Sequence, residues 1–79
     1  MPVGRGTKRP ELPNERVAND LRAKIKNGDY MPGEALPTVA QLAKDHGVST
    51  ATVSKALATL RGEGLIVTRP RWGSFVAES

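Results

Sequence analysis

The chain has 79 residues, no cysteine, one histidine and a formal net charge of +4 at pH 7. A chain of this length buries only roughly 60% of the surface that its unfolded form exposes, so we expect one domain with a modest core and no enclosed catalytic cavity. The lack of cysteine excludes disulfides and thiolate zinc sites, and no apolar run approaches the roughly 20 residues of a membrane span. We therefore expect a soluble, cytoplasmic protein without a metal, a cofactor or a membrane partner.

Residues 1–13 predict a flexible basic arm ahead of a folded domain at 14–79. The segment is rich in glycine and proline, and its apolar residues show no spacing that would form a packed face. Two interpretations stay open: a disordered leader, or an arm that follows an anionic partner. The basic residues of the arm are Arg5, Lys8 and Arg9.

Residues 14–28 predict a first helix. Asn14 can cap its start, and Gly28 suits the left-handed conformation that often follows a helix end. The turn-rich connector at 29–37 comes next. Its larger apolar residues are expected to fold back onto the core. The apolar stripe of the helix is Val17, Ala18, Leu21 and Ile25, and the connector contributes Tyr30, Met31 and Leu36.

A second, short helix begins after Thr38. The Thr38 side chain can cap it, and Gln41 three residues later completes the pattern of a capping box. Gly47 ends the helix. We interpret His46, in the last turn, as a partner of the helix dipole or of the terminal carbonyls and not as a metal ligand.

A third helix begins after Ser49 and ends at Gly62 or Gly64. Its apolar residues follow the helical period. The connection through residues 47–49 leaves no space for a long loop, which indicates a helix-turn-helix with Val48 plugging the gap between the two helices. The inward-facing residues are Val53, Ala56, Leu57 and Leu60.

The last segment changes from a helical to a strand pattern. Residues 65–68 and 74–77 are β-rich, and residues 69–73 between them are typical of a turn, so we expect a short hairpin. An isolated hairpin is marginal in water and must pack on the helices. The fold class is therefore mainly α with a small β-hairpin: a winged helix-turn-helix of three helices and a two-stranded wing.

This fold predicts a double-stranded DNA partner, because the second helix of a helix-turn-helix pair lies in the major groove and its early residues meet base edges. Here that helix presents small and hydroxylated side chains with one long cation, Lys55. The alternative is an ordinary solvated helix surface, although so many small and β-branched residues make a poor one. The candidate DNA-binding residues are Thr38, Ser49, Thr50, Ala51, Thr52, Ser54, Lys55, Thr59, Arg69, Arg71, Trp72 and Gly73.

The hairpin tip carries two arginines around Pro70. Arg69 and Arg71 suit phosphates or the minor groove, where negative potential is focused. Arg71 has an alternative role as an exposed solubilising charge. For Trp72 we expect a structural role covering the hairpin and the third helix, with stacking on a sugar or base as the alternative.

The stretch from Val17 to Val76 resembles the DNA-binding domain of the gluconate-repressor (GntR) family. That resemblance implies a winged helix, operator binding and transcriptional control, usually repression by dimers on palindromic sites. The residues that carry it are Gly28, Pro32-Gly33-Glu34, Leu36-Pro37, Leu42-Ala43, Gly47-Val48-Ser49, Ala56-Leu57, Leu60, Glu63-Gly64-Leu65 and Gly73-Ser74-Phe75-Val76.

The chain departs from the usual family pattern at four positions. Ala40 stands where members commonly have an arginine, and Thr50 and Ser54 align with arginines frequent in the recognition helix. Arg71 replaces the first glycine of the wing's Gly-x-Gly. The run from Gly47 to Leu57 is also similar to the recognition helix of the lactose-repressor (LacI) family, which implies that Thr50, Ala51 and Lys55 face bases.

Two further expectations concern the whole protein. Family members carry a C-terminal domain for effector binding and dimerisation, so this chain is either an excised domain or a minimal protein, and a homodimer on a palindromic operator depends on such a domain. The alternative function is a winged helix that binds a protein instead of a specific operator. An enzyme is not expected, because no base, nucleophile and orienting group are arranged together.

Overall fold

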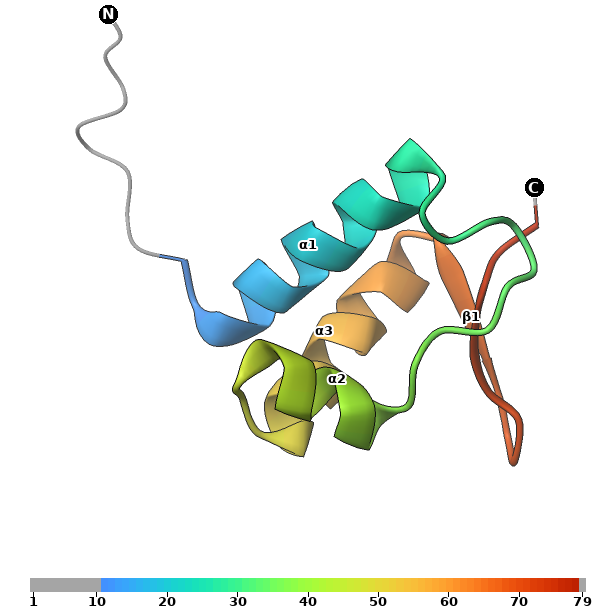
Figure 1. Cartoon of the computed structure of the whole chain (residues 1–79). Helices are drawn as coiled ribbons and strands as arrows, with labels where there is room; N and C mark the ends of the chain where they lie inside the picture. Colours follow the sequence, from blue (N-terminus) through green and yellow to red (C-terminus); the bar gives the residue numbers. More distant parts are fainter. Residues whose placement is uncertain (1–10, 79) are drawn as a thin grey trace, which may run out of the picture.

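A computed structural model describes residues 11–78 of the chain. The helices are α1 (Pro13–Asn27), α2 (Val39–His46) and α3 (Thr50–Gly62), and the strands are β1 (Ile66–Arg69) and β2 (Gly73–Val76). The three helices pack together, and the hairpin extends from the C-terminal end of α3 to the side of the bundle (Figure 1). This is the winged helix-turn-helix that the sequence predicts. Within residues 11–78, none of the helices is both long and apolar enough to cross a membrane.

Helix α1 begins one residue earlier than expected, so the prediction that Asn14 caps it is wrong. Leu12 takes the cap position, and its backbone N–H donates to the Glu15 carboxylate at 3.1 Å. Pro13 suits the first helical position because the N–H that proline lacks has no partner there anyway. The predicted arm lies outside the described residues at 1–10, and its last residue, Pro13, belongs to the helix. Gly28 ends α1 in the left-handed conformation, as predicted, with φ at 86°.

Side-chain caps start both helices of the helix-turn-helix. Thr38 Oγ1 accepts from the backbone N–H of Gln41, and Ser49 Oγ accepts from that of Thr52, both at 3.1 Å. The capping box at α2 is only half formed, because the Gln41 side chain donates to Asp45 at 2.8 Å and not to the Thr38 backbone. The short turn after Gly47, which has φ at 67°, brings α3 directly onto α2.

The core lies between the three helices and the base of the hairpin. Leu36 of the connector is buried in it, and Tyr30 packs against its edge, as expected. Met31 is 58% exposed, so its predicted burial is wrong. Residues 31–34 form a tight turn in which the Met31 backbone N–H donates to the Glu34 carboxylate at 2.8 Å, and this turn leaves the Met31 side chain in solvent. The buried residues are Val17, Ala18, Leu21, Leu36, Leu42, Ala43, Val53, Ala56, Leu57, Leu60, Ile66 and Val76.

The hairpin is a four-residue antiparallel ladder whose pairs run from Ile66 and Val76 at the base to Arg69 and Gly73 near the tip. Ile66 and Val76 enter the core and fix the base of the hairpin on the helices. The connector runs along β2, because the Leu36 backbone N–H donates to the carbonyl of Ser74 in that strand at 2.8 Å. Beyond this contact, the end of the hairpin projects away from the three helices (Figure 1).

Candidate nucleic-acid interface

The exposed side of α3 is narrow. Val53, Leu57 and Leu60 point into the core, and helical spacing puts a row of small residues and one lysine on the opposite side. Only the Lys55 side chain is long, so a partner can approach the helix backbone closely along this row. We call this row the outer face of α3; it consists of Ala51, Ser54, Lys55 and Ala58, all exposed.

The predicted residues around the outer face differ in how free their hydroxyls are. Ser49 Oγ caps α3 and donates to Thr52 Oγ1 at 3.0 Å, so these two hydroxyls satisfy each other. Thr59 Oγ1 donates to the Lys55 carbonyl at 3.2 Å, within its own helix. Thr38 serves as the cap of α2. Thr50, in contrast, is exposed in the first turn of α3, next to the outer face.

Trp72 lies at the tip of the hairpin and is 76% exposed, so the expectation that it covers the hairpin and α3 is wrong. Its backbone N–H donates to the Arg69 carbonyl at 3.0 Å and closes a tight turn over Pro70 and Arg71. The indole is attached beyond the last paired residues and has no strand beneath it. The tip is therefore formed by Pro70, Arg71 and Trp72, with Arg69 and Gly73 as the pair below them.

Arg71 holds a left-handed backbone conformation, with φ at 71°, and is the one described residue other than glycine with a positive φ. A side chain in this conformation is strained by roughly 1–2 kcal/mol, which glycine avoids. The position therefore suits the glycine that the family pattern has there, and this chain places an exposed guanidinium on it instead.

Arg61 connects α3 to the wing, a contact that the sequence did not reveal. Arg61 Nη1 donates to Thr68 Oγ1 at 3.1 Å, and Thr68 Oγ1 lies 3.4 Å from Ser74 Oγ on the other strand. The guanidinium thus links the last turn of α3 to β1, and Thr68 extends this link to β2. A cation in that turn was the only sequence signal, and its partner depends on how the hairpin packs.

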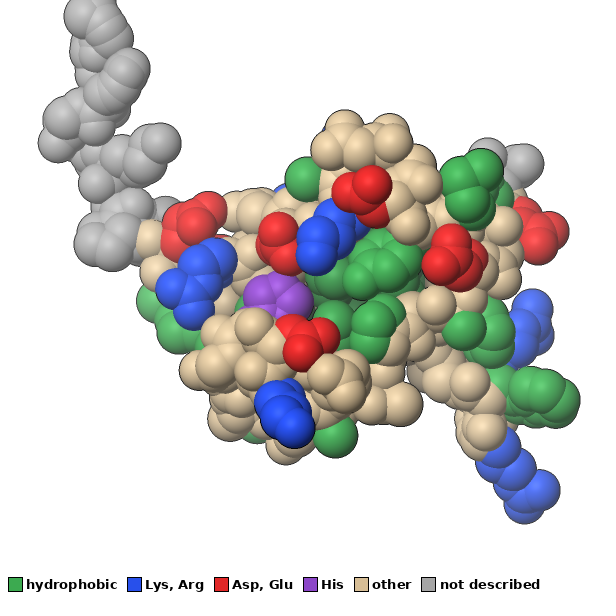
Figure 2. All heavy atoms as spheres, viewed as in Figure 1, with side chains coloured by type: hydrophobic (Ala, Val, Ile, Leu, Met, Phe, Trp, Pro, Cys, Tyr) green, Lys and Arg blue, Asp and Glu red, His purple; other side chains and the backbone are tan. Residues whose placement is uncertain are grey.

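Acidic residues are concentrated on the body of the domain and are scarce in α3 and the wing. From residue 48 to residue 77 the sequence has four cations and one acid, Glu63. Arg22 of α1 donates to both carboxylate oxygens of Glu63, at 2.8 and 2.7 Å, and these bonds lower the pKa of Glu63. The red side chains in Figure 2 gather over α1, α2 and the connector, whereas the projecting end of the hairpin is blue and green. The four cations are Lys55, Arg61, Arg69 and Arg71.

The N-terminal end of α3 and the wing tip lie on the same side of the molecule. In Figure 1 the N-terminal end of α3 and the tip of the hairpin both lie along the lower edge, and α1 lies along the upper one. A narrow helix and a cationic hairpin, held at a fixed angle, form a surface that suits a duplex: a helix for the major groove and a wing for the adjacent backbone.

Comparisons with known proteins agree with this geometry. The family model described as "Bacterial regulatory proteins, gntR family" matches residues 13–76 of the chain. The chain belongs to the GntR family. It is 44% identical over 64 residues to the transcriptional regulator YjiR of Escherichia coli K12. The matched stretch covers 81% of this chain and 14% of YjiR. It is 38% identical over 64 residues to the histidine utilization repressor of Klebsiella aerogenes, covering 81% and 27% of the two chains.

The fold of this GntR domain also matches a solved protein–DNA complex. The structure of the AraR DNA-binding domain with operator ORR3 superimposes with a TM-score of 0.85 at 28% identity, covering 98% of this chain and 90% of that one. The match includes the wing as well as the helices. The fold and family predictions are thereby confirmed, whereas the individual contact residues stay predictions.

In this GntR domain His46 ties α2 to α1. Its Nδ1 lies 2.9 Å from the Leu42 carbonyl, and its Nε2 lies 3.0 Å from the Asp20 carboxylate. The hydrogen bond from His46 lowers the pKa of Asp20, helped by the nearby charge of Lys24. The predicted terminal-carbonyl contact of His46 is thus present, and the bridge to α1 is an addition.

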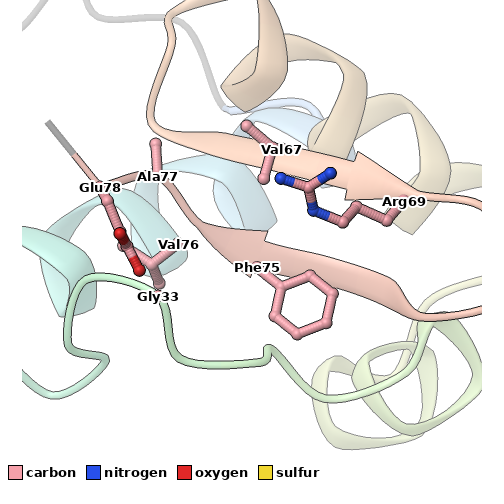
Figure 3. Close-up of a pocket in the computed structure, with 7 residues that line it drawn as sticks. All are labelled: Gly33, Val67, Arg69, Phe75, Val76, Ala77 and Glu78. Carbon is pink, nitrogen blue, oxygen red and sulfur yellow. The ribbon is translucent and has the colours of Figure 1, made fainter.

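A shallow hollow of about 400 Å³ lies on the outer face of the hairpin. Figure 3 shows Arg69 and Phe75 at one end of it and Glu78 beside Gly33 at the other. The hollow is open to solvent and carries both signs of charge. Glu78 therefore marks where the cationic surface of the wing ends.

Proposed function

We propose that this GntR domain binds double-stranded DNA sequence-specifically and serves a bacterial transcriptional repressor, which acts in the cytoplasm at the nucleoid. The observation that supports this most directly is the joint presentation of the outer face of α3 and the wing. The N-terminal end of α3 and the wing tip lie on one side (Figure 1), and the one acid in the sequence between them, Glu63, is paired with Arg22. A surface of this sign and shape complements the phosphates and the major groove of one duplex.

The outer face of α3 supplies the base contacts in this proposal. Ala51 and the Thr50 methyl suit thymine methyl groups, and Ser54 can donate to or accept from a base edge. Lys55 is the one side chain there that is long enough to reach a guanine or a neighbouring phosphate. Arg69 and Arg71 contact the backbone and the minor groove. Because Thr50 and Ser54 replace family arginines, the preferred operator differs from those of typical members.

The remaining predicted residues have supporting roles. Thr38, Ser49 and Thr52 place the helix N-termini, where backbone N–H groups can meet a phosphate. Thr59 lies farther along α3, and Gly73 allows the wing to turn with φ at 102°. The chain spans 14% of YjiR and 27% of the histidine utilization repressor. A homodimer on a palindromic operator is proposed for a protein in which a further domain joins two copies.

The proposal is tested by selecting tight-binding duplexes from a random library with the 79-residue chain. Anisotropy titrations then compare the selected duplex with a scrambled one between 50 and 200 mM salt. We expect the selected duplex to bind at least about tenfold tighter at every salt concentration. Equal affinity for both duplexes throughout this range would refute specific binding.

Matched variants separate the two parts of the interface. Lys55→Ala is expected to reduce the ratio between selected and scrambled duplexes, because it removes a base-reaching group. The double change Arg69→Ala and Arg71→Ala is expected to weaken both duplexes alike and to lower the salt slope by about 2. Lys26→Ala, which removes one positive charge from α1, as Lys55→Ala does from α3, serves as the control and is expected to change neither quantity appreciably.

A further inference from the structure

Trp72 is the only tryptophan in the chain and, among the large apolar residues at 11–78, it is the most exposed, at 76%. An indole in this position contributes little to the core, because its burial on folding is small. The other exposed large apolar residues are on the body or on the strands. Trp72 alone combines exposure with a place at the end of a projecting element. Its position is therefore better suited to contact with a partner than to stability.

The support beneath Trp72 is rigid and narrow. The bond from its N–H to the Arg69 carbonyl closes the tip, and the Arg61–Thr68 contact fixes the wing on α3. Two strands joined by a three-residue tip are thin enough to enter a groove of a duplex. Figure 1 shows the tip as the part of the described chain that extends farthest from the bundle on the side of the N-terminal end of α3.

The charges around Trp72 indicate which partner it meets. Arg69 and Arg71 precede it in the same hairpin end, and no acidic residue occurs between Glu63 and Glu78. An exposed aromatic ring on a cationic hairpin complements a polyanion whose apolar surfaces are sugars and base faces. A protein partner would need a matching acidic pocket with an apolar centre, whereas any duplex offers this combination along its minor groove.

We propose that Trp72 acts as a wedge in the minor groove beside the site read by α3, where the indole stacks against a partly opened base step. This inference rests on the proposed function and extends it. Apolar side chains that enter the minor groove unstack a step and kink the duplex, and pyrimidine–purine steps such as TpA open most readily. The wing thereby selects a deformable step at a position that α3 does not contact.

The single tryptophan makes the wedge directly measurable. A series of selected duplexes carries TpA or ApA at each flanking step in turn, and both anisotropy and Trp72 emission are recorded. We expect quenched emission and protection from acrylamide in the complex. We also expect one flanking position at which TpA binds about five- to tenfold tighter than ApA.

Variants of Trp72 complete the test. Trp72→Ala is expected to bind about tenfold more weakly and to lose the TpA preference, while Trp72→Phe keeps most of both because it retains a ring. Both should fold normally, since the side chain is exposed. Met31→Ala, a change at another exposed apolar residue, is the control, and this variant should bind as the parent chain does.

The outcomes distinguish this inference from the function on which it rests. Unchanged emission at saturation, or Trp72→Ala binding both duplexes like the parent chain, overturns the wedge while operator preference persists. Altered emission without any step preference also overturns it, because the indole then lies against the backbone without opening a step. Failure of the parent chain to prefer any selected duplex refutes the proposed function itself.

Discussion

Arg71 holds a backbone conformation that side chains rarely adopt, and it does so at the most projecting turn of the molecule. Such strain persists only where the surrounding structure imposes it, and it is concentrated at functional positions. Here the hairpin register and the bond from Trp72 to Arg69 impose it. This conformation places an exposed cation at the wing tip, and the proposed function assigns this residue to the backbone and the minor groove of a bound duplex.

Two substitutions at residue 71 separate strain from charge. Arg71→Gly is expected to raise the free energy of unfolding by about 1 kcal/mol, because glycine adopts a positive φ without strain. It should also weaken duplex binding severalfold. Arg71→Ala should weaken binding to the same extent without the gain in stability, since alanine keeps the strain. Urea unfolding followed by circular dichroism and anisotropy titration measure the two effects, and equal stability of the two variants would contradict the account.

Single residues were also where the sequence misled us. Met31 was expected to fold back onto the core, and Trp72 was expected to cover the hairpin and the third helix, yet both are in solvent. Each belongs to a tight turn closed by backbone hydrogen bonds, and the turn decides where the side chain points. The hydrophobicity of a side chain does not specify the direction in which the turn points it.

Among the elements, the helix-turn-helix depends on its side-chain caps. Ser49 satisfies the backbone N–H of Thr52, which has no carbonyl partner at the start of α3. Its hydroxyl also pairs with that of Thr52. The cap thereby fixes the first turn of the helix that would meet the bases.

Ser49→Ala is expected to lower the free energy of unfolding by about 1 kcal/mol, the usual effect of losing a cap. Asn14→Ala is the matched control, because Asn14 lies inside α1 and does not cap it. This change should stay within about 0.5 kcal/mol, since alanine is the better helix former. Urea unfolding monitored by circular dichroism compares the two, and a larger loss at residue 14 would contradict the observed cap.

Helical periods and glycine stops located the three helices to within one or two residues of their observed bounds, and the β-rich pattern located the two strands equally well. The periodicity of apolar side chains and the caps are local properties, so the sequence contains them. The observed helix caps differ from the predicted ones where a neighbouring residue competes for the same position or hydrogen bond. Leu12 holds the cap position predicted for Asn14, with Pro13 as the first helical residue, and Asp45 accepts from the Gln41 side chain in place of the capping box.

At the scale of the whole molecule, two polar links attach α1 to the helix-turn-helix. Arg22 pairs with Glu63 after α3, and Asp20 pairs with His46 of α2. In the folded state the pKa of Asp20 is below its usual value, chiefly through the hydrogen bond from His46. A carboxylate of this kind stabilises the fold above its unfolded pKa, and the stabilisation is lost as the pH falls through its folded value.

Asp20→Asn is therefore expected to lower the free energy of unfolding by about 0.5 kcal/mol at pH 7, a magnitude suited to a partly exposed pair. The difference from the parent chain should shrink as the pH falls below about 4 and should approach zero only below the lowered folded pKa of Asp20, where the carboxyl is protonated in both the folded and the unfolded state. Asp45→Asn is the control, because Asp45 accepts a hydrogen bond from Gln41 of its own helix. Urea unfolding at pH 7 and pH 2.5 measures both, and a difference for Asp20 that is independent of pH would contradict the link.

By itself the sequence determined the order and the type of the elements, the family and the small, arginine-poor face of α3. These depend on near neighbours along the chain: periodic apolar residues, caps and glycine stops. Only the tertiary structure decided that Arg61 braces the wing, that His46 reaches Asp20 and that Trp72 projects into solvent. Each of these depends on the packing of segments that are distant in sequence or on the direction imposed by a turn, which no local pattern specifies.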